Sequence, residues 1–357
     1  MPTVARAPSR VVAHGPGRVN LIGEHTDYNG GLALPFAIER GVTVTATAAP
    51  GGEIAVQARD LGQEDTFALA EPGRPGDHEG WRAFARGTVA ELAAAGEDLR
   101  PAQVVVESDL PRGAGLSSSA ALAAGLCLAL LGLAGEAEPG PGDRHELARL
   151  CSRVENDWVG AQTGLLDQLA ALCGEPGRAL RIDFRTLAVE PVPLELADRR
   201  LVVLDSGAAH THAGSGYNER RAECEAACAR LGVETLSEAD PAAADALPEP
   251  LRRRARHVLT ENARVEEMVA ALEAGDLGTA GALLDASHAS LRDDYDASVP
   301  AVERAVEALK AAGATGARMV GGGFGGAVLG LLGPGARAPD GALDVAPADG
   351  ARVLSRR

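Results

Sequence analysis

Lysine is almost absent from this chain of 357 residues, because Lys310 is the only one. A Walker phosphate-binding loop ends in Gly-Lys-Ser or Gly-Lys-Thr, and a protein-kinase site requires a lysine–glutamate pair, so the sequence excludes both. Aromatic residues are also scarce, at 3% of the chain, so aliphatic side chains must fill the cores that a hydrophobic content of 46% supports. The length allows two domains that share a cleft.

Basic residues are also outnumbered by acidic ones, 34 to 50, so the formal net charge is −16. Nucleic acids and anionic membranes favour cationic surfaces, so we expect neither as a partner. The first residues lack the apolar run of a signal peptide, and the one long uncharged apolar stretch is interpreted as a buried helix. The five cysteines are odd in number, which favours free thiols in a reducing compartment. We therefore expect a cytoplasmic protein.

The segment from Gly17 to Gly31 (GRVNLIGEHTDYNGG) is the most informative part of the sequence. It places a cation, two carboxylates, an imidazole, a phenol and an amide between glycines. Val19, Leu21 and Ile22 are apolar, so we expect the segment to be half buried, where each ionised group needs a partner. Short polar side chains that converge on a turn suit a ligand with many hydroxyls, such as a sugar. The alternative is a strand followed by a salt-bridged turn.

A second glycine-rich segment, Leu110–Ala121 (LPRGAGLSSSAA), leads into an Ala/Leu-rich stretch that predicts a buried helix to Leu133. Ser117 or Ser118 is expected as its N-cap. Free N–H groups at a helix N-terminus bind phosphate, and a serine hydroxyl there can ligate Mg²⁺. A flexible loop capped by serine is the alternative.

A third segment, Gly321–Gly326 (GGGFGG), lies between two expected strands, 317–320 and 327–332. It is similar to GxGxxG, but no helix is expected after it, which argues against a dinucleotide site.

Other patterns predict further elements. Strands are expected at 42–48, 53–58, 103–108 and 200–204, helices at 81–95, 145–159, 220–231, 257–272 and 302–312, and loops at 72–80 and 136–143. Strands and helices do not alternate strictly, so the prediction is an α+β fold.

Taken in this order, the three segments resemble the three motifs of the GHMP small-molecule kinases, and the first is similar, nearly residue for residue, to the galactokinase signature. The resemblance covers about residues 16–330. It implies a two-domain GHMP kinase fold, divided at 1–192 and 193–357, with the active site in the interdomain cleft. It also implies a monomeric enzyme that uses ATP and Mg²⁺ to phosphorylate galactose at its anomeric hydroxyl.

The resemblance assigns roles to individual residues. Asp167 is expected to act as the base, with Arg18 assisting. The residues expected at the sugar are Glu24, His25, Asp27, Gly164 and Tyr217. The residues expected at ATP are Trp81 and Phe84 for adenine, and Gly113, Gly115, Leu116, Ser117, Ser118 and Ser119 for the phosphates. Glu155 is an expected Mg²⁺ ligand, with Ser118 or Ser119 as a second; Ser119 is preferred.

Alternatives stay open for several of these residues. Trp81 lies at helical spacing with Phe84 and can simply be core, Glu155 can be a solvated helix end, and Tyr217 can pack against a loop. A kinase for galactosamine, N-acetylgalactosamine or arabinose would keep every motif. A non-catalytic sensor of galactose and ATP is a further possibility, which the complete serine run and Asp167 disfavour.

The C-terminal region departs from the family. The segment 333–343 is too short and too rich in glycine and proline for the helix that galactokinases usually have there. A last strand is expected at 343–346 or at 351–354.

Overall fold

The computed structural model describes residues 7–111, 113–161, 163–208 and 213–357. The first six residues lie outside this part of the chain, and the expected absence of a signal peptide depends on them. Arg112 also lies outside it; this residue belongs to residues 110–119 of the second glycine-rich segment, which we call the serine-rich loop.

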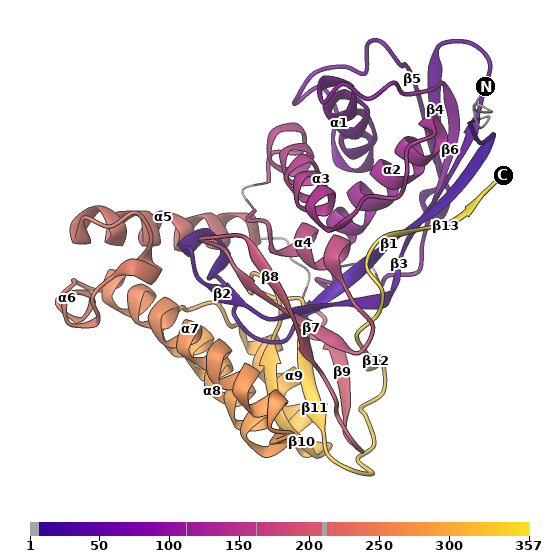
Figure 1. Ribbon diagram of the computed structural model, residues 1–357. Coiled ribbons are helices and arrows are strands. Elements are labelled where there is room, and N and C mark those ends of the chain that lie inside the picture. Colours follow the sequence, from indigo (N-terminus) through magenta and orange to yellow (C-terminus); the bar gives the residue numbers. More distant parts are fainter. Residues whose placement is uncertain (1–6, 112, 162, 209–212) are drawn as a thin grey trace.

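A six-stranded sheet with the order β13-β1-β3-β6-β4-β5 forms the upper part of the molecule (Figure 1). Its strands are β1 (Arg10–Asn20), β3 (Pro35–Ala48), β4 (Glu53–Ala58), β5 (Gln63–Ala68), β6 (Ala102–Ser108) and β13 (Arg352–Arg356). The helices beside it are α1 (Gly80–Ala94), α2 (Ser118–Ala134), α3 (Pro141–Arg153) and α4 (Leu166–Cys173). Helix α2 packs directly on β1 and β3, so the serine-rich loop that precedes it lies beside the end of β1.

The lower part is built on a four-stranded sheet with the order β10-β11-β9-β12 (Figure 1). Its strands are β9 (Arg200–Asp205), β10 (Ala314–Met319), β11 (Ala327–Leu332) and β12 (Leu343–Val345). The helices of this part are α5 (Ala213–Leu231), α6 (Pro241–Asp245), α7 (Leu251–Glu273), α8 (Leu277–Asp293) and α9 (Pro300–Ala311). A small third sheet of β2 (Leu32–Ala33), β7 (Arg178–Asp183) and β8 (Ala188–Pro193) lies between the two parts and contacts α7.

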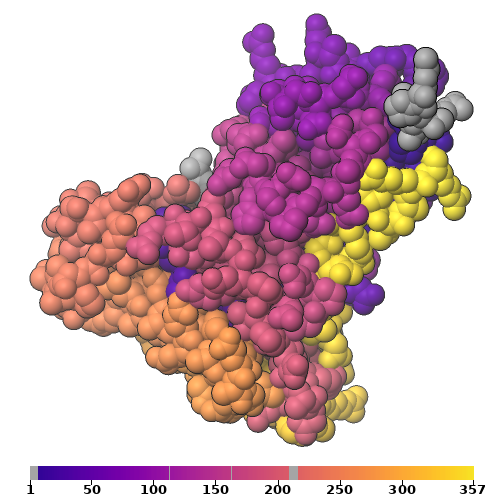
Figure 2. Space-filling view, viewed as in Figure 1, coloured from indigo at the N-terminus to yellow at the C-terminus, as the bar shows by residue number. Residues whose placement is uncertain are grey.

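The two parts share an apolar core. One cluster of buried side chains runs from Val44 of β3 through Leu21 and Ile22 to Met268 of α7 and Leu329 of β11. The C-terminal strand adds a second link, because β13 leaves the lower part and pairs antiparallel with β1. Figure 2 shows this C-terminal segment, in yellow, along the flank of the upper part. The division of the chain into two domains at residue 192 stays a prediction. The last strand, β13, comes from the C-terminal half of the chain but pairs with β1 in the upper part.

Several predicted elements agree with the structure, and the α+β fold class is confirmed. Strands β9 and β11 lie within one residue of the expected bounds, and the third glycine-rich segment joins two strands as expected. Both candidate C-terminal strands form, as β12 and β13, and residues 333–342 hold no helix.

Other expectations are wrong in extent. The segment around Leu21 is almost fully buried rather than half buried, because it passes between the two parts. The expected loop 136–143 is shorter, since Pro141 begins α3. The expected helix 145–159 is regular only to Arg153 and continues as a π-helical turn, Val154–Trp158. None of the helices in the described ranges combines the length and the apolar character needed to cross a membrane.

Candidate active site

Asp167, in the first turn of α4, forms an ion pair with Arg18 of β1. The Nε and Nη2 atoms of Arg18 both lie 2.7 Å from Asp167 Oδ1. The Ser117 hydroxyl donates a hydrogen bond to Asp167 Oδ2. Arg18 also donates from Nη1 to the carbonyl of Gly115, at 2.7 Å. The pair therefore joins β1, the serine-rich loop and α4 at one point.

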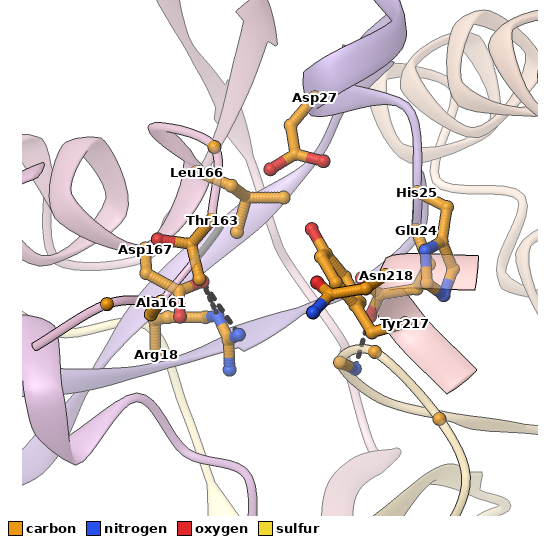
Figure 3. Close-up of a pocket in the computed structure, with 15 residues that line it drawn as sticks. Arg18, Glu24, His25, Asp27, Ala161, Thr163, Leu166, Asp167, Tyr217 and Asn218 are labelled. Atoms are coloured by element: carbon orange, nitrogen blue, oxygen red, sulfur yellow. Dashed lines mark hydrogen bonds and ion pairs between the residues drawn. The ribbon is translucent and has the colours of Figure 1, made fainter. Parts of the chain in front are cut away.

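A cavity of about 350 Å³ opens beside this ion pair. Its lining includes every residue expected at the sugar: Glu24, His25, Asp27, Gly164 and Tyr217. In Figure 3, Arg18 and Asp167 lie on one side of the cavity, and Glu24, His25 and Tyr217 lie on the other. The structure thus brings together residues from both halves of the chain around one polar space, which we call the polar pocket.

Two glycines leave room for polar pocket side chains. A Cβ atom on Gly164 would lie 2.1 Å from Asp27 Oδ2, and one on Gly322 would lie 2.9 Å from Tyr217 Cδ2. The absence of a side chain at Gly164 therefore allows the Asp27 carboxylate to lie against the loop before α4. Gly164 also lines the polar pocket itself.

Buried charges from the lower part of the molecule hold the turn that carries Glu24. Glu24 Oε1 accepts a hydrogen bond from the Gly321 N–H at 2.7 Å and lies 3.4 Å from Arg318 Nη2. Glu261 Oε1 accepts from the Gly23 N–H at 3.0 Å. Neither Arg318 nor Glu261 is among the residues expected from the sequence, although an arginine inside the apolar strand β10 is a signal that could have identified Arg318.

Two carboxyl groups near Asp167 have a raised pKa, one in the polar pocket and one outside its lining. Burial and the nearby charge of Asp167 raise the pKa of Asp27 to about 7, and the same two causes raise the pKa of Glu155 to about 7. Burial and the charge of His257 lower the pKa of His25 to about 3, so this ring is neutral. Without ligands, the carboxyl groups of Asp27 and Glu155 are therefore only partly ionised at neutral pH.

A second cavity, of about 330 Å³, has Trp81, Phe84, Ser118 and Ser119 in its lining. Phe84 is buried, whereas Trp81 is only partly buried and donates from Nε1 to Gln63 Oε1 at 3.0 Å. Trp81 both lines the cavity and packs against the core, so the two interpretations of this residue are not exclusive.

The serine-rich loop differs in one respect from the expectation. Ser117 immediately precedes α2, but its φ is 57° and its side chain does not cap the helix. Its hydroxyl bonds to Asp167 instead. Gly113 and Gly115 also have positive φ, of 73° and 66°, and the Leu116 carbonyl accepts a hydrogen bond from the Arg18 N–H. The loop is therefore shaped by its contact with Asp167 and β1.

Glu155 is buried rather than part of a solvated helix end, at 7% exposure. Its Oε2 accepts a hydrogen bond from Gln168 Nε2 at 2.6 Å, and a hydrogen bond with the Ser119 side chain works against its raised pKa. A carboxylate and a hydroxyl are the oxygen ligands that Mg²⁺ prefers, so these residues fit the ion. Among the described residues no group of three or more His, Cys, Asp or Glu forms a complete metal site. Mg²⁺ held by one or two protein oxygens would complete its shell with water and substrate phosphates.

Comparisons with known proteins show which family has this sequence and fold. The family model for the galactokinase galactose-binding signature matches residues 2–48, that for the N-terminal domain of GHMP kinases matches residues 83–175, and that for their C-terminal domain matches residues 268–346. A galactokinase of Mycobacterium tuberculosis is 48% identical over 331 residues, which cover 91% of this chain and 89% of that protein. A galactokinase of Streptomyces coelicolor is 43% identical over 330 residues, covering 89% and 83%.

Solved structures show the same fold. The structure of Lactococcus lactis galactokinase complexed with galactose superposes with a TM-score of 0.88 at 33% identity, over 98% of this chain and 96% of that one. Methanococcus jannaschii mevalonate kinase shares the fold, with a TM-score of 0.71 at 18% identity over 96% and 99%. The fold and its motifs define a small-molecule kinase of the GHMP class. Within that class, the chain belongs to the galactokinase family.

Proposed function

We propose that this chain transfers the γ-phosphoryl group of ATP to the anomeric hydroxyl of galactose, giving galactose 1-phosphate and ADP. The observation that supports this proposal most directly is the position of the Asp167 carboxylate. Arg18 and Ser117 hold it at the wall of the polar pocket and beside the serine-rich loop. The names of the related proteins, all galactokinases, support the choice of sugar.

In this proposal, Asp167 orients the anomeric hydroxyl and accepts its proton, while the hydroxyl oxygen bonds to the γ-phosphorus and the bond to the β-phosphate oxygen breaks. Arg18 keeps Asp167 ionised and faces the developing negative charge. Glu24, His25, Asp27, Gly164 and Tyr217 line the sugar site. Catalysis of this kind depends mainly on positioning and charge stabilisation.

Trp81 and Phe84 would contact the adenine, and the loop from Gly113 to Ser119 would receive the phosphates through its backbone N–H groups. Glu155 and Ser119 would hold Mg²⁺. When bound, the ion neutralises phosphate charge that the chain, without a lysine in the loop, cannot neutralise alone. That the chain works as a monomer in the cytoplasm stays a prediction.

A coupled assay of ADP release, run with a panel of sugars, tests the function. We expect turnover with galactose, dependent on Mg²⁺, above that with galactosamine, N-acetylgalactosamine and arabinose. A higher kcat/KM for one of those sugars would change the assignment of the substrate, and no sugar-dependent ADP release at all would contradict an enzymatic role.

Two substitutions separate the two cavities. Asp27→Ala should weaken galactose binding and leave ATP binding intact, because a hydroxyl of the sugar loses its carboxyl hydrogen-bond partner. Trp81→Ala should raise the KM for ATP and leave galactose nearly unaffected. Calorimetry with each ligand measures both. Loss of both ligands by either variant would indicate a folding defect, and a lower melting temperature of Trp81→Ala without a change in ATP dependence would favour a purely structural role.

A further inference from the structure

Behind His25, a chain of hydrogen bonds leads away from the polar pocket. His25 Nδ1 lies 2.8 Å from the Tyr28 hydroxyl, which lies 2.8 Å from the Tyr295 hydroxyl. The Tyr295 hydroxyl lies 3.1 Å from Cys224 Sγ, and Asn29 Nδ2 lies 3.6 Å from the same sulfur. All of these residues except Tyr28, which is partly exposed, are buried. These hydrogen bonds join the segment 17–31, which we call the signature segment, to α5 and to the residues that follow α8.

Asn29 is one donor to the sulfur at the far end of this chain. Its Nδ2 lies 2.8 Å from the backbone carbonyl of His25, which can only accept, so this atom is the amino group and not the amide oxygen. The amino group then donates its other hydrogen to Cys224 Sγ. The chain can run in two directions, and only one of them gives the thiol hydrogen an acceptor: Cys224 donates to Tyr295, Tyr295 to Tyr28, and Tyr28 to His25 Nδ1.

A ring nitrogen that accepts a hydrogen bond carries no proton, so the single proton of the neutral His25 ring is then on Nε2. Nε2 is buried and has no well-directed hydrogen bond to any described residue, although His25 lines the polar pocket. The ring centroid lies 4.5 Å from that of Tyr295 and 5.4 Å from that of Tyr217, so the ring has little room to turn. The Gly322 backbone lies near enough to the ring to raise its pKa slightly, but no bond of good geometry joins it to Nε2, so this buried donor lacks a well-directed acceptor.

We propose that Tyr28, Tyr295 and Cys224 are positioning residues that hold His25 in its Nε2–H tautomer, so that Nε2 donates a hydrogen bond to one hydroxyl oxygen of the bound sugar. The inference rests on the proposed function, because it takes a sugar as the ligand. The three positioning residues touch neither the sugar nor the reacting atoms, and they act through His25.

The tautomer can be measured without any sugar. In ¹⁵N-edited NMR spectra of the histidine rings, with His25 identified through the spectrum of His25→Gln, we expect the proton of the wild-type ring on Nε2. In Tyr28→Phe, which removes the donor to Nδ1, we expect a mixture of tautomers or a shift to the Nδ1–H form. A wild-type ring protonated at Nδ1 would overturn the proposal, whatever the chain phosphorylates.

Steady-state kinetics give a second readout. Tyr28→Phe should raise the KM for galactose ~3- to 10-fold, the range for one neutral hydrogen bond, with the KM for ATP unchanged. Cys224→Ser keeps a donor and an acceptor, so its KM for galactose should lie closer to wild type than that of Cys224→Ala. Cys228→Ala, one turn further along α5 and outside the chain of hydrogen bonds, is the matched control. An unchanged KM in both Tyr28→Phe and Cys224→Ala would contradict the proposal.

Galactose analogues that each lack one hydroxyl identify the oxygen that His25 serves. The effect of Tyr28→Phe on KM should disappear for one analogue and persist for the others, as in a double-mutant cycle between protein and substrate. An equal effect for every analogue would show that the substitution disturbs the pocket generally, and would overturn the proposal. If the wild-type chain did not phosphorylate galactose, the proposed function would fail, and the NMR measurement would still decide the tautomer.

Discussion

At the scale of single residues, both oxygens of the Asp167 carboxylate are constrained, one by Arg18 and the other by Ser117. Asparagine would fill the same space but cannot accept a proton. We therefore expect Asp167→Asn to lower kcat by roughly 10²- to 10⁴-fold, while galactose and ATP still bind. The decrease is smaller if the hydroxyl loses its proton late in a loose transition state. Single-turnover kinetics and calorimetry measure the two effects separately.

The double variant with Arg18→Ala is the informative companion. If the two residues act as one unit, Arg18→Ala should add little to the loss already caused by Asp167→Asn. Multiplicative losses would mean that Arg18 acts on the phosphoryl group independently. Turnover near that of the wild type in Asp167→Asn would remove Asp167 from the mechanism.

Glu155 gives the site a dependence of stability on pH. Its pKa is raised from 4.5 to about 7 in the folded protein, by burial and by Asp167. Between these values the folded state binds more protons than the unfolded chain, so the free energy of unfolding falls as the pH rises. Glu155→Gln stays neutral, so in the absence of ligands it should be more stable than the wild type by about 1–3 kcal/mol near pH 8 and by little near pH 5.

Calorimetric melting curves at several pH values check this prediction. A constant difference between the two proteins across the range would show that Glu155 is ionised throughout. Mg²⁺ with ATP should remove the advantage of the variant, because the ligands stabilise the ionised carboxylate of the wild type only.

At the scale of secondary-structure elements, the close approach of α2 to β1 aligns the serine-rich loop with Arg18. A Cβ atom on Gly15 of β1 would lie 2.0 Å from the Ala121 carbonyl of α2, where only backbone atoms are available to move. We expect Gly15→Ala to lower the free energy of unfolding by ~3 kcal/mol. Gly52→Ala is the matched control, since no atom lies within 4 Å of the added methyl group. Urea unfolding of both variants measures the difference, and equal stabilities would contradict this account of the packing.

Local sequence patterns predict some elements, and tertiary contacts determine others. Strands β9 and β11 are continuous apolar runs, so pattern alone indicates them. Strand β1 contains Gly15, Pro16 and Gly17, residues that normally interrupt a strand, and it is stabilised by its neighbours β3 and β13 instead. Helix α8 and the β7–β8 hairpin are likewise set by tertiary packing rather than by a clear period.

The candidate site follows a similar division. Residues that lie within the dense polar motifs, such as His25 and Asp27, are identifiable from the sequence, and the polar pocket brings them together. Tyr295 and Cys224 are not, because each meets the segment 17–31 across roughly 200 or more intervening residues, and short-range patterns carry no information about such contacts. The role of Ser117 beside Asp167 is hidden for the same reason.

At the scale of the whole molecule, one buried arginine links the lower sheet to the signature segment. Arg318 of β10 is fully buried and donates from Nη1 to the carbonyls of Asn20 and Leu21, at 3.0 and 3.1 Å. Its Nη2 lies 3.4 Å from Glu24 Oε1. The hydrogen bonds of this one side chain hold the end of β1, and its ion pair with Glu24 reaches a wall of the polar pocket.

Arg318→Met tests this link, because methionine fills much of the volume but leaves the Glu24 carboxylate and two carbonyls buried with fewer partners. We expect a loss of about 3–5 kcal/mol in the free energy of unfolding, together with a higher KM for galactose and a smaller change in the KM for ATP. Arg292→Met on the exposed surface of α8, where ion pairs contribute about 0–1 kcal/mol, is the control. Equal stabilities of the two variants would mean that the neighbouring Glu261 and the shared apolar core hold the signature segment without Arg318. A loss of stability with an unchanged KM for galactose would mean that Arg318 joins the two parts of the molecule but does not orient Glu24.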